Sequence, residues 1–316
     1  MKLDPATRKL LALMQAQERP AIWELDPPAA RAQNDPLSEA SEHLPVDVGR
    51  VEDRVIAAGG NEIPIRIYWP AGISAPAPIH VYCHGGGGVI GNIDTHDSVC
   101  RTLASESGCV TISVGYRLGP EHRFPAGLHD ALAAFGWARD NAEEIGGDGS
   151  LMAVGGDSCG GGIAASVAQA LRNETVRPVC QLLICPALDA SRDAQKYPSY
   201  GDNAHGYFLD HTLIDWFQSH YLEETQDLSD PSVSPLLNPD LRDLPRTVLI
   251  TAGFDPLRDE GQRYAEKLRE AGVAVDYRCY ESTIHSFVSM GRFIPLATEA
   301  LQYCGAALHK AIRSPA

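Results

Sequence analysis

Short apolar runs alternate with amphipathic segments from about residue 50 to the end of the chain. Runs rich in Val, Ile and Leu predict buried strands, whereas apolar positions three and four apart predict helices that cover them. The predicted strands are Val51–Ala57, Ile63–Trp69, Ile79–Cys83, Val110–Gly115, Leu151–Gly155, Val179–Cys185, Thr247–Thr251 and Val275–Tyr280. The predicted helices are Ser98–Ser107, Gly127–Ile145, Gly161–Asn173, Asp210–Leu222, Arg258–Ala271 and Pro295–Ile312. The first two strands adjoin as a hairpin or meander and the others form β-α-β units, so we expect an α/β fold with a mostly parallel sheet.

Two segments lack this alternation and predict a cap. Residues 1–46 are helical in pattern and punctuated by prolines, and residues 191–235 are rich in aromatic side chains. We interpret residues 1–46 as an N-terminal cap segment and residues 47–316 as the main domain, with residues 191–235 as an inserted cap segment. Both cap segments are expected to pack together over the carboxyl edge of the sheet. The alternative is that they are surface elements with no role at a functional site.

The chain has 316 residues and a formal net charge of −15, which suits one large core plus a small lid. An acidic surface repels nucleic-acid phosphates and anionic lipids, so neither is expected as a partner. No run approaches the ~20 apolar residues of a membrane span, and charges interrupt the apolar positions of the N-terminus. We therefore predict no signal peptide and a cytoplasmic location. The eight cysteines, without a CxxC pair, are interpreted as free thiols that hold no zinc.

The strongest chemical signal is the pentapeptide Gly156-Asp157-Ser158-Cys159-Gly160. A G-x-S-x-G sequence between an apolar strand and a small-residue helix is typical of a nucleophile elbow, in which glycines avoid collisions with neighbouring segments. We therefore predict Ser158 as the nucleophile. Cys159 is a rival, but a cysteine at the centre of such a turn would need glycine at position 157, where Asp157 stands. The backbone N–H of Cys159 is instead expected to stabilise an oxyanion.

A second signal, His84-Gly85-Gly86-Gly87-Gly88, directly follows a predicted strand. Consecutive glycines expose backbone N–H groups, which an acyl-transfer site needs as donors for the developing negative charge. We assign the N–H groups of Gly85 and Gly86 to this oxyanion hole and expect His84 to be structural. The alternatives are a flexible loop or a phosphate cradle, but the Gly-Lys-Ser/Thr of a phosphate-binding loop is missing.

A serine nucleophile needs a base, and in this fold class the chain order is Ser, then an acid, then His. His285 falls in the loop after the last predicted strand, whereas His309 lies on an expected solvated face of the C-terminal helix. Asp255 closely follows the preceding strand. Two acids that begin the next helix compete for the same role, namely Asp259 and Glu260. Acids at that position favour the positive end of the helix dipole, so we predict a triad of Ser158, His285 and Asp255.

Together these motifs resemble the hormone-sensitive-lipase family of esterases, bacterial family IV. The matching pieces are His84-Gly-Gly-Gly, Val89-Ile-Gly-Asn-Ile-Asp94-Thr-His-Asp97, Tyr116-Arg-Leu118 with Pro120-Glu-His122, Gly156-Asp-Ser-Cys-Gly160, Asp255-Pro-Leu-Arg-Asp-Glu-Gly261 and His285. The resemblance implies an eight-stranded α/β-hydrolase fold with a helical cap, and carboxylester hydrolysis without a cofactor. It also implies a preference for short to medium acyl chains and frequent homodimers.

The chain departs from the family at three positions, where a bulky aromatic residue, alanine and glycine are usual: Gly88, Cys159 and Ser286. The first of these predicts a roomier pocket beside the oxyanion hole. Asp94, His96 and Asp97 look like a set of metal ligands. Hydrogen bonding within the loop and at a helix cap is the favoured interpretation, so no metal is predicted. Arg117 and Glu121 are expected to form a structural pair under the site.

The predicted function is a serine carboxylesterase that acts on a small-molecule ester through an acyl-enzyme. A non-catalytic small-molecule binder on the same fold and an amide or lactone hydrolase are alternatives. The expected substrate contacts are Gly87, Gly88, Asp157, Tyr207, Phe208 and Phe287.

Overall fold

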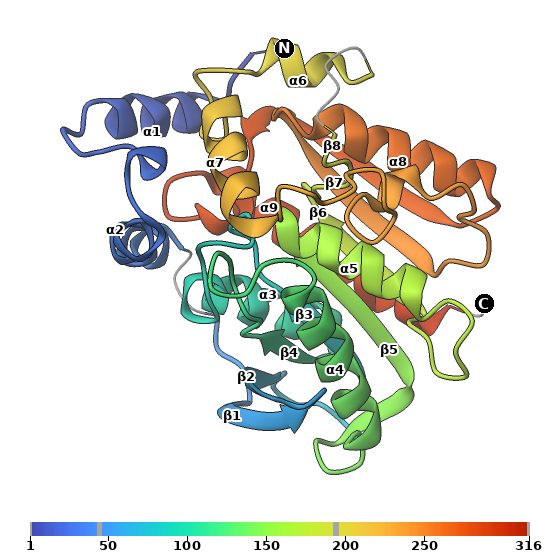
Figure 1. The fold of residues 1–316 in the computed structure, drawn as a ribbon. Helices are drawn as coiled ribbons and strands as arrows, with labels where there is room; N and C mark the ends of the chain where they lie inside the picture. The colour runs from blue at the N-terminus through green and yellow to red at the C-terminus, as the bar shows by residue number, and fades with distance from the viewer. Residues whose placement is uncertain (1, 43–45, 192–195, 315–316) are drawn as a thin grey trace.

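An eight-stranded sheet runs through the computed structural model, which describes residues 2–42, 46–191 and 196–314 (Figure 1). The strands are β1 (Arg50–Ala58), β2 (Asn61–Trp69), β3 (Ala77–Cys83), β4 (Val110–Val114), β5 (Gly147–Asp157), β6 (Cys180–Ile184), β7 (Arg246–Phe254) and β8 (Val275–Ile284). Their order across the sheet is β1-β2-β4-β3-β5-β6-β7-β8. The pairs β1–β2 and β2–β4 are antiparallel, and the other neighbouring pairs are parallel. The predicted mostly parallel sheet with an initial hairpin is confirmed.

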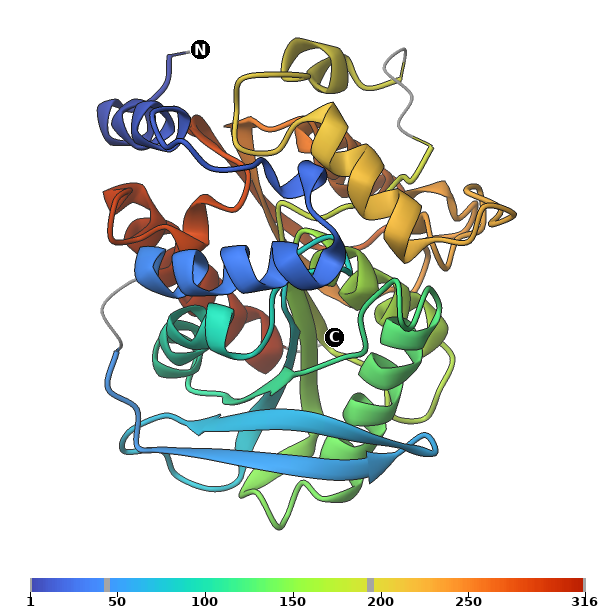
Figure 2. The same cartoon turned by 60° about the vertical axis from the view of Figure 1, so that its left-hand side comes forward.

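Helices cover both faces of this sheet (Figures 1 and 2). The helices are α1 (Pro5–Gln15), α2 (Pro27–Ser41), α3 (Asp97–Ser107), α4 (Ala126–Asp140), α5 (Cys159–Ala170), α6 (Pro198–Asp202), α7 (His211–Tyr221), α8 (Arg258–Glu270) and α9 (Pro295–Arg313), with short 3-10 turns η1 (Ile22–Glu24), η2 (Asp94–His96), η3 (Pro235–Leu237) and η4 (Phe287–Ser289). Helices α3 and α9 pack with one face of the sheet, and α4, α5 and α8 with the other. All seven residues of β3 are buried, as expected for a central strand covered on both faces.

The two predicted cap segments lie together beside the loop that follows β3. Apolar side chains of η1 and α7 pack around Ala30 of α2 and around Val89 and Ile90 of that loop. Figure 2 shows α1 and α7 at the end of the molecule opposite the β1–β2 hairpin, with α2 between. The division at residue 46 stays a prediction, and residues 43–45 and 192–195 of the predicted cap segments lie outside the described residues.

Aspartates begin three helices of the cap. The side chains of Asp4, Asp26 and Asp210 each accept an N–H from the first turn of α1, α2 and α7 respectively. A proline follows Asp4 and Asp26 directly, and proline suits the first helical position because its missing N–H would have no partner there. Local sequence therefore sets where the cap helices start, and tertiary packing sets where they lie.

Salt bridges near the cap differ from the expected pair of Arg117 with Glu121, and that prediction is wrong. Arg117 pairs with the buried Asp130 of α4, with 2.8 Å between Nε and Oδ2, and Asp130 also accepts the backbone N–H of Arg117. Glu121 pairs instead with Arg31 of α2, with 2.7 Å between Oε2 and Nη2. The guanidinium of Arg31 also donates to the carbonyl oxygens of Val89 and Gly119. Arg31 thus ties the N-terminal cap segment to the main domain.

Within the described ranges, no helix is long and apolar enough to cross a bilayer. The eight cysteines all fall in these ranges and are free thiols. Six of them are buried, where an uncharged thiol packs as a small hydrophobic group.

Truncation of the buried core should cost far more stability than truncation of an exposed apolar residue. Leu103 of α3 is fully buried, so Leu103→Ala should lower the free energy of unfolding by about 2–5 kcal/mol, because it leaves a cavity. Leu13 of α1 is 48% exposed, and Leu13→Ala should change it by no more than about 0.5 kcal/mol. Urea denaturation measures both values. Equal effects of the two variants would contradict the packing described for α3.

Candidate active site

Ser158 lies in the tight turn between β5 and α5. Its backbone has φ 54° and ψ −123°, a region that residues with a side chain adopt only under strain. A Cβ on Gly156 would lie 2.4 Å from the carbonyl oxygen of Gly160, and a Cβ on Gly160 would lie 2.1 Å from that of Cys83. Glycine is therefore required at both positions, as the nucleophile-elbow interpretation expects.

Ser158 also occupies the N-cap position of α5, yet its hydroxyl caps nothing. Serine is a favoured N-cap residue because its oxygen usually accepts an N–H from the first helical turn. Here Oγ lies 2.8 Å from Nε2 of His285 instead. The N–H groups of the first turn, including that of Cys159, lack intrahelical acceptors, and the positive end of the helix dipole favours negative charge beside them.

The three residues predicted as a triad form one chain of hydrogen bonds. Nδ1 of His285 lies 2.7 Å from Oδ2 of Asp255, and Nε2 of His285 faces Ser158. Oδ1 of Asp255 accepts the N–H of Leu257 at 2.8 Å, so the carboxylate is held on both sides. Asp255 and His285 are buried, whereas Ser158 remains 9% exposed. The arrangement orients the imidazole with one nitrogen toward the acid and the other toward the hydroxyl.

The competing acids and base lie outside this chain of hydrogen bonds. Asp259 accepts the N–H of Ser199 at 2.7 Å, and Glu260 accepts the N–H of Leu188 at 2.6 Å. Burial raises the pKa of Glu260 well above its usual range. His309 is exposed on α9, and its Nδ1 contacts a backbone carbonyl. None of these three groups is bonded to Ser158: the two acids bind backbone N–H groups, and His309 contacts the last residue of α3.

In the glycine turn after β3, one of the N–H groups predicted to stabilise an oxyanion is bonded to another residue. The N–H of Gly85 donates to Oδ1 of Asp157 at 2.9 Å, so it is not available to an oxyanion, and its assignment to the oxyanion hole is corrected. The N–H groups of Gly86 and Gly87 have no hydrogen-bond partner among the described residues. Together with the N–H of Cys159, they remain as candidate donors.

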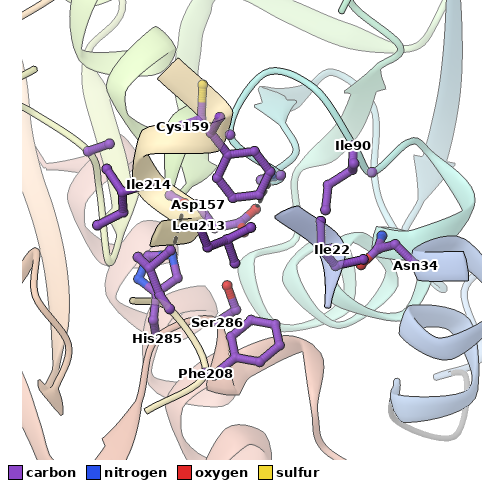
Figure 3. A pocket seen from close by; sticks show the side chains of 18 of the residues that line it. Ile22, Asn34, Ile90, Asp157, Cys159, Phe208, Leu213, Ile214, His285 and Ser286 are labelled. Atoms are coloured by element: carbon purple, nitrogen blue, oxygen red, sulfur yellow. Dashed lines mark hydrogen bonds between the residues drawn. The ribbon is translucent and has the colours of Figure 1, made fainter. Parts of the chain in front are cut away.

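The thiol of Cys159 is not placed to attack a substrate. It lies against the hydroxyl of Tyr221 of α7, and its sulfur points away from His285 in Figure 3. Burial raises the pKa of this thiol to about 12, with the nearby carboxylate of Asp157 adding to the effect. A thiol that stays protonated near neutral pH is a poor nucleophile.

A cavity of about 700 Å³ opens at Ser158. Both cap segments line it, through side chains that include Leu10, Met14, Ile22, Asn34, Tyr207, Phe208, Leu213, Ile214 and Phe217. Figure 3 shows Leu213 and Ile214 near His285, with Ile22 and Asn34 across the cavity from them. The cap segments therefore lie at the site, against the alternative of surface elements remote from it.

Four of the six predicted substrate contacts line this cavity: Gly87, Asp157, Tyr207 and Phe208. Phe287 does not, because the η4 turn directs its ring into the core against Tyr280, and its assignment is wrong. Gly88 does not line the cavity either. A Cβ on Gly88 would lie 2.4 Å from the ring of Tyr221, so a cap aromatic occupies the space that was expected to be empty. The prediction of a roomier pocket at Gly88 is therefore wrong.

The metal-like cluster is divided among separate ion pairs. Asp94 and Asp97 both pair with Arg66 of β2, whereas His96 lies 3.3 Å from Asp157. In the described part of the chain, no group of three or more His, Cys, Asp and Glu could hold a metal ion. Sequence reasoning missed the contact of His96 with Asp157, because the two residues lie on different segments and no spacing rule joins them.

Comparison with known proteins places the chain in a family. The family described as "alpha/beta hydrolase fold" matches residues 80–289, which include the glycine turn, the elbow and the candidate triad. The chain therefore belongs to the α/β-hydrolase family, in its hormone-sensitive-lipase-like branch, and the resemblance predicted from the motifs is confirmed.

Particular relatives cover most of the chain. Carboxylesterase NlhH of Mycobacterium tuberculosis is 41% identical over 84% of this chain and 84% of its own length. Ethyl acetate hydrolase of Pseudomonas putida is 38% identical over 77% of this chain and 76% of its own length. Among solved structures, a serine-to-alanine mutant of an α/β-hydrolase enzyme from the metagenome of Lake Arreo has a TM-score of 0.94 and 45% identity, covering 97% of this chain and 98% of that chain.

Substitution of Gly88 should disturb the cap more than substitution of a glycine in open space. Gly88 and Gly60 both have positive φ, at 73° and 80°, so alanine strains the backbone at either position. A Cβ on Gly60 meets nothing within 4 Å, whereas one on Gly88 collides with Tyr221. Gly88→Ala should therefore lower the free energy of unfolding by about 1–3 kcal/mol more than Gly60→Ala. Denaturation curves measure the difference, and equal losses would show that Tyr221 does not occupy this space.

Proposed function

We propose that the chain is a serine carboxylesterase in which Ser158 is the nucleophile, His285 the base and Asp255 the acid. The observation that carries this proposal is the unbroken chain of hydrogen bonds from Asp255 through His285 to Ser158, at the wall of a cavity of about 700 Å³. Relatives named carboxylesterase, ethyl acetate hydrolase and arylesterase support an ester as the substrate class.

In the first half-reaction, Nε2 of His285 takes the proton of Ser158 while Oγ attacks the ester carbonyl carbon. The carbonyl oxygen becomes negatively charged in the tetrahedral intermediate. The N–H groups of Gly86, Gly87 and Cys159 are the proposed hydrogen-bond donors that stabilise that charge. His285 then gives its proton to the leaving alcohol, and the acyl group stays on Ser158.

In the second half-reaction, His285 takes a proton from water, which attacks the acyl-enzyme carbonyl. The same N–H donors stabilise the second tetrahedral intermediate, and the proton returns to Ser158 as the acid leaves. Asp255 stabilises the imidazolium that forms in each half-reaction, because its carboxylate stays bonded to Nδ1. The chain supplies every group that this sequence uses, so we propose no cofactor.

The cavity suits a small ester with an apolar acyl or alcohol group. Apolar side chains line it around Ser158. They are Ile163 of α5, Leu213 and Phe217 of α7, and Val233 of the segment after α7. We propose short to medium acyl chains on this basis and on the family resemblance. A cytoplasmic location and a homodimer stay predictions.

Loss of the Ser158 hydroxyl should abolish turnover without unfolding the protein. Ser158→Ala should lower kcat for p-nitrophenyl butyrate by at least about 10³-fold, because it removes the hydroxyl that lies against Nε2 of His285. Ser150→Ala is a matched control, since Ser150 is exposed near the opposite end of β5 and its hydroxyl bonds to Asp148. That variant should keep the wild-type rate. A fluorophosphonate probe should label the wild type and Ser150→Ala but not Ser158→Ala; full activity or labelling of Ser158→Ala would reject the assignment.

A panel of acyl substrates separates ester hydrolysis from its alternatives. p-Nitrophenyl esters from acetate to palmitate should give the highest kcat/KM at short to medium chain length, because the cavity is bounded by the cap. The corresponding anilides and a set of lactones should react much more slowly. A maximum with the palmitate ester would overturn the chain-length proposal, and faster turnover of anilides or lactones would replace the ester as substrate class.

A further inference from the structure

Asp157 carries a buried carboxylate that the proposed acyl transfer does not use. It directly precedes Ser158 and is 2% exposed. Its Oδ1 accepts the hydroxyl proton of Tyr82 at 2.8 Å and the N–H of Gly85 at 2.9 Å, and its Oδ2 lies 3.3 Å from Nε2 of His96. This carboxylate therefore joins the end of β5 to the end of β3, to the glycine turn and to the η2 turn.

The two ring nitrogens of His96 face a hydroxyl on one side and a carboxylate on the other. Oγ1 of Thr95 lies 2.9 Å from the carbonyl oxygen of Asn92, which can only accept, so the Thr95 hydroxyl donates there. Nδ1 of His96 lies 2.9 Å from the same Oγ1 and must then be the donor. Nε2 lies 3.3 Å from Oδ2 of Asp157 and 3.3 Å from the backbone nitrogen of Gly85. The carboxylate favours a proton on Nε2, and with the ring protonated His96 and Asp157 form an ion pair.

The charges around this pair agree with that state. Burial by itself opposes ionisation of both groups, but their mutual attraction and hydrogen bond outweigh it, lowering the pKa of Asp157 and raising the pKa of His96. Glu42 at the end of α2 adds a second acid near His96. His84 lies 5.6 Å from His96 between ring centroids, and burial lowers the pKa of His84 to about 4, which leaves it neutral beside the imidazolium.

The ion pair holds the backbone from which the candidate oxyanion donors project. A Cβ on Gly85 would lie 2.2 Å from Oδ2 of Asp157, so only glycine lets the carboxylate reach this N–H. The carbonyl oxygen of Gly86 accepts the N–H groups of Val89 and Ile90, at 3.1 and 3.0 Å. The turn is thus held at both ends. Between these two attachments the N–H groups of Gly86 and Gly87 are not bonded to any residue in the described ranges, and they take their direction from the backbone on either side.

We propose that Asp157, ion-paired with His96, is a positioning residue that directs the N–H groups of Gly86 and Gly87 toward the oxyanion formed at Ser158. The proposal rests on the proposed function, because it assigns a role within the same oxyanion hole. Asp157 lines the cavity, but both of its carboxylate oxygens face protein groups, so the proposed role is not contact with the ester. It acts through the N–H of Gly85, and it therefore affects stabilisation of the tetrahedral intermediate rather than binding of the ester.

The test is the Asp157→Asn variant of the full chain, assayed with p-nitrophenyl butyrate and with a butyl trifluoromethyl ketone, which forms a tetrahedral adduct with the active-site serine. Misdirected donors should lower kcat about 10- to 100-fold, while KM stays within about twofold of wild type. The inhibition constant of the ketone should rise by the same factor as kcat/KM falls, since adduct and transition state share the oxyanion. A folded variant with wild-type kcat, or with the loss confined to KM, would overturn the proposal.

Asp130→Asn is the matched control for loss of a buried carboxylate. Asp130 is 1% exposed, and it bonds to the guanidinium and the N–H of Arg117 rather than to an N–H of the glycine turn. This variant should lose stability while its kcat and its ketone inhibition constant stay at wild-type values. A parallel loss of both in Asp130→Asn would show that any buried carboxylate has the effect, and would overturn the specific role of Asp157.

Two milder variants decide the question if Asp157→Asn does not fold. Tyr82→Phe removes one hydrogen bond to the carboxylate, and His96→Gln removes the positive charge while leaving an amide donor. Each should lower kcat and raise the ketone inhibition constant by one common factor, smaller than that of Asp157→Asn. Wild-type values in both would overturn the proposal. An inactive wild type, or an active Ser158→Ala, would instead reject the proposed function, so the two failures are distinguishable.

Discussion

The strained backbone of Ser158 is the constraint on which the site depends. A residue with a side chain holds φ 54° only if its neighbours prevent relaxation. Here the N–H of Ser158 donates to the carbonyl oxygen of Ile184 on β6, and its own carbonyl oxygen accepts the N–H of Ala187, both at 2.9 Å. At Gly156 and Gly160 the backbone of neighbouring segments is so close that a Cβ would collide with carbonyl oxygens. The parallel sheet thus stabilises a turn that frees the hydroxyl and the helix N-terminus together.

Two carboxylates lie on either side of this turn, and each is bonded to a histidine. Asp255 is bonded to His285, which faces both the hydroxyl and the cavity. Asp157 is bonded to His96, which is buried among polar groups that already occupy both ring nitrogens. In the proposed mechanism the first histidine exchanges a proton through Nε2, whose partner is the hydroxyl of Ser158. The ring nitrogens of the second face Thr95 and Asp157, which suits the positioning role proposed for that pair.

The cap completes the site by occupying the space that glycines leave. A Cβ on Gly87 would meet the ring of Phe217, and one on Gly88 would meet Tyr221, both on α7. The small residues of the turn therefore allow cap aromatics to approach, and the cavity keeps its walls although the turn itself has no side chains. Arg31 of α2 binds the carbonyl oxygen of Val89 in this loop and that of Gly119 in the connection between β4 and α4. Both cap segments thus contact the loop that carries the candidate oxyanion donors.

The sequence by itself determined the strands, the elbow and the order of the candidate triad, because these depend on local patterns. Apolar runs specify buried strands, and a parallel sheet brings Ser158, Asp255 and His285 to one edge from loops after three strands. Only the tertiary structure decided whether Gly85, Gly88 and Phe287 have the predicted roles at the site. It also decided which residues pair with Arg117 and His96. Those outcomes depend on contacts between segments far apart in the chain, such as Asp157 with Gly85 and Tyr221 with Gly88. Residue type shows which bonds a side chain can make, but the packing of the cap and the sheet decides which partner it meets.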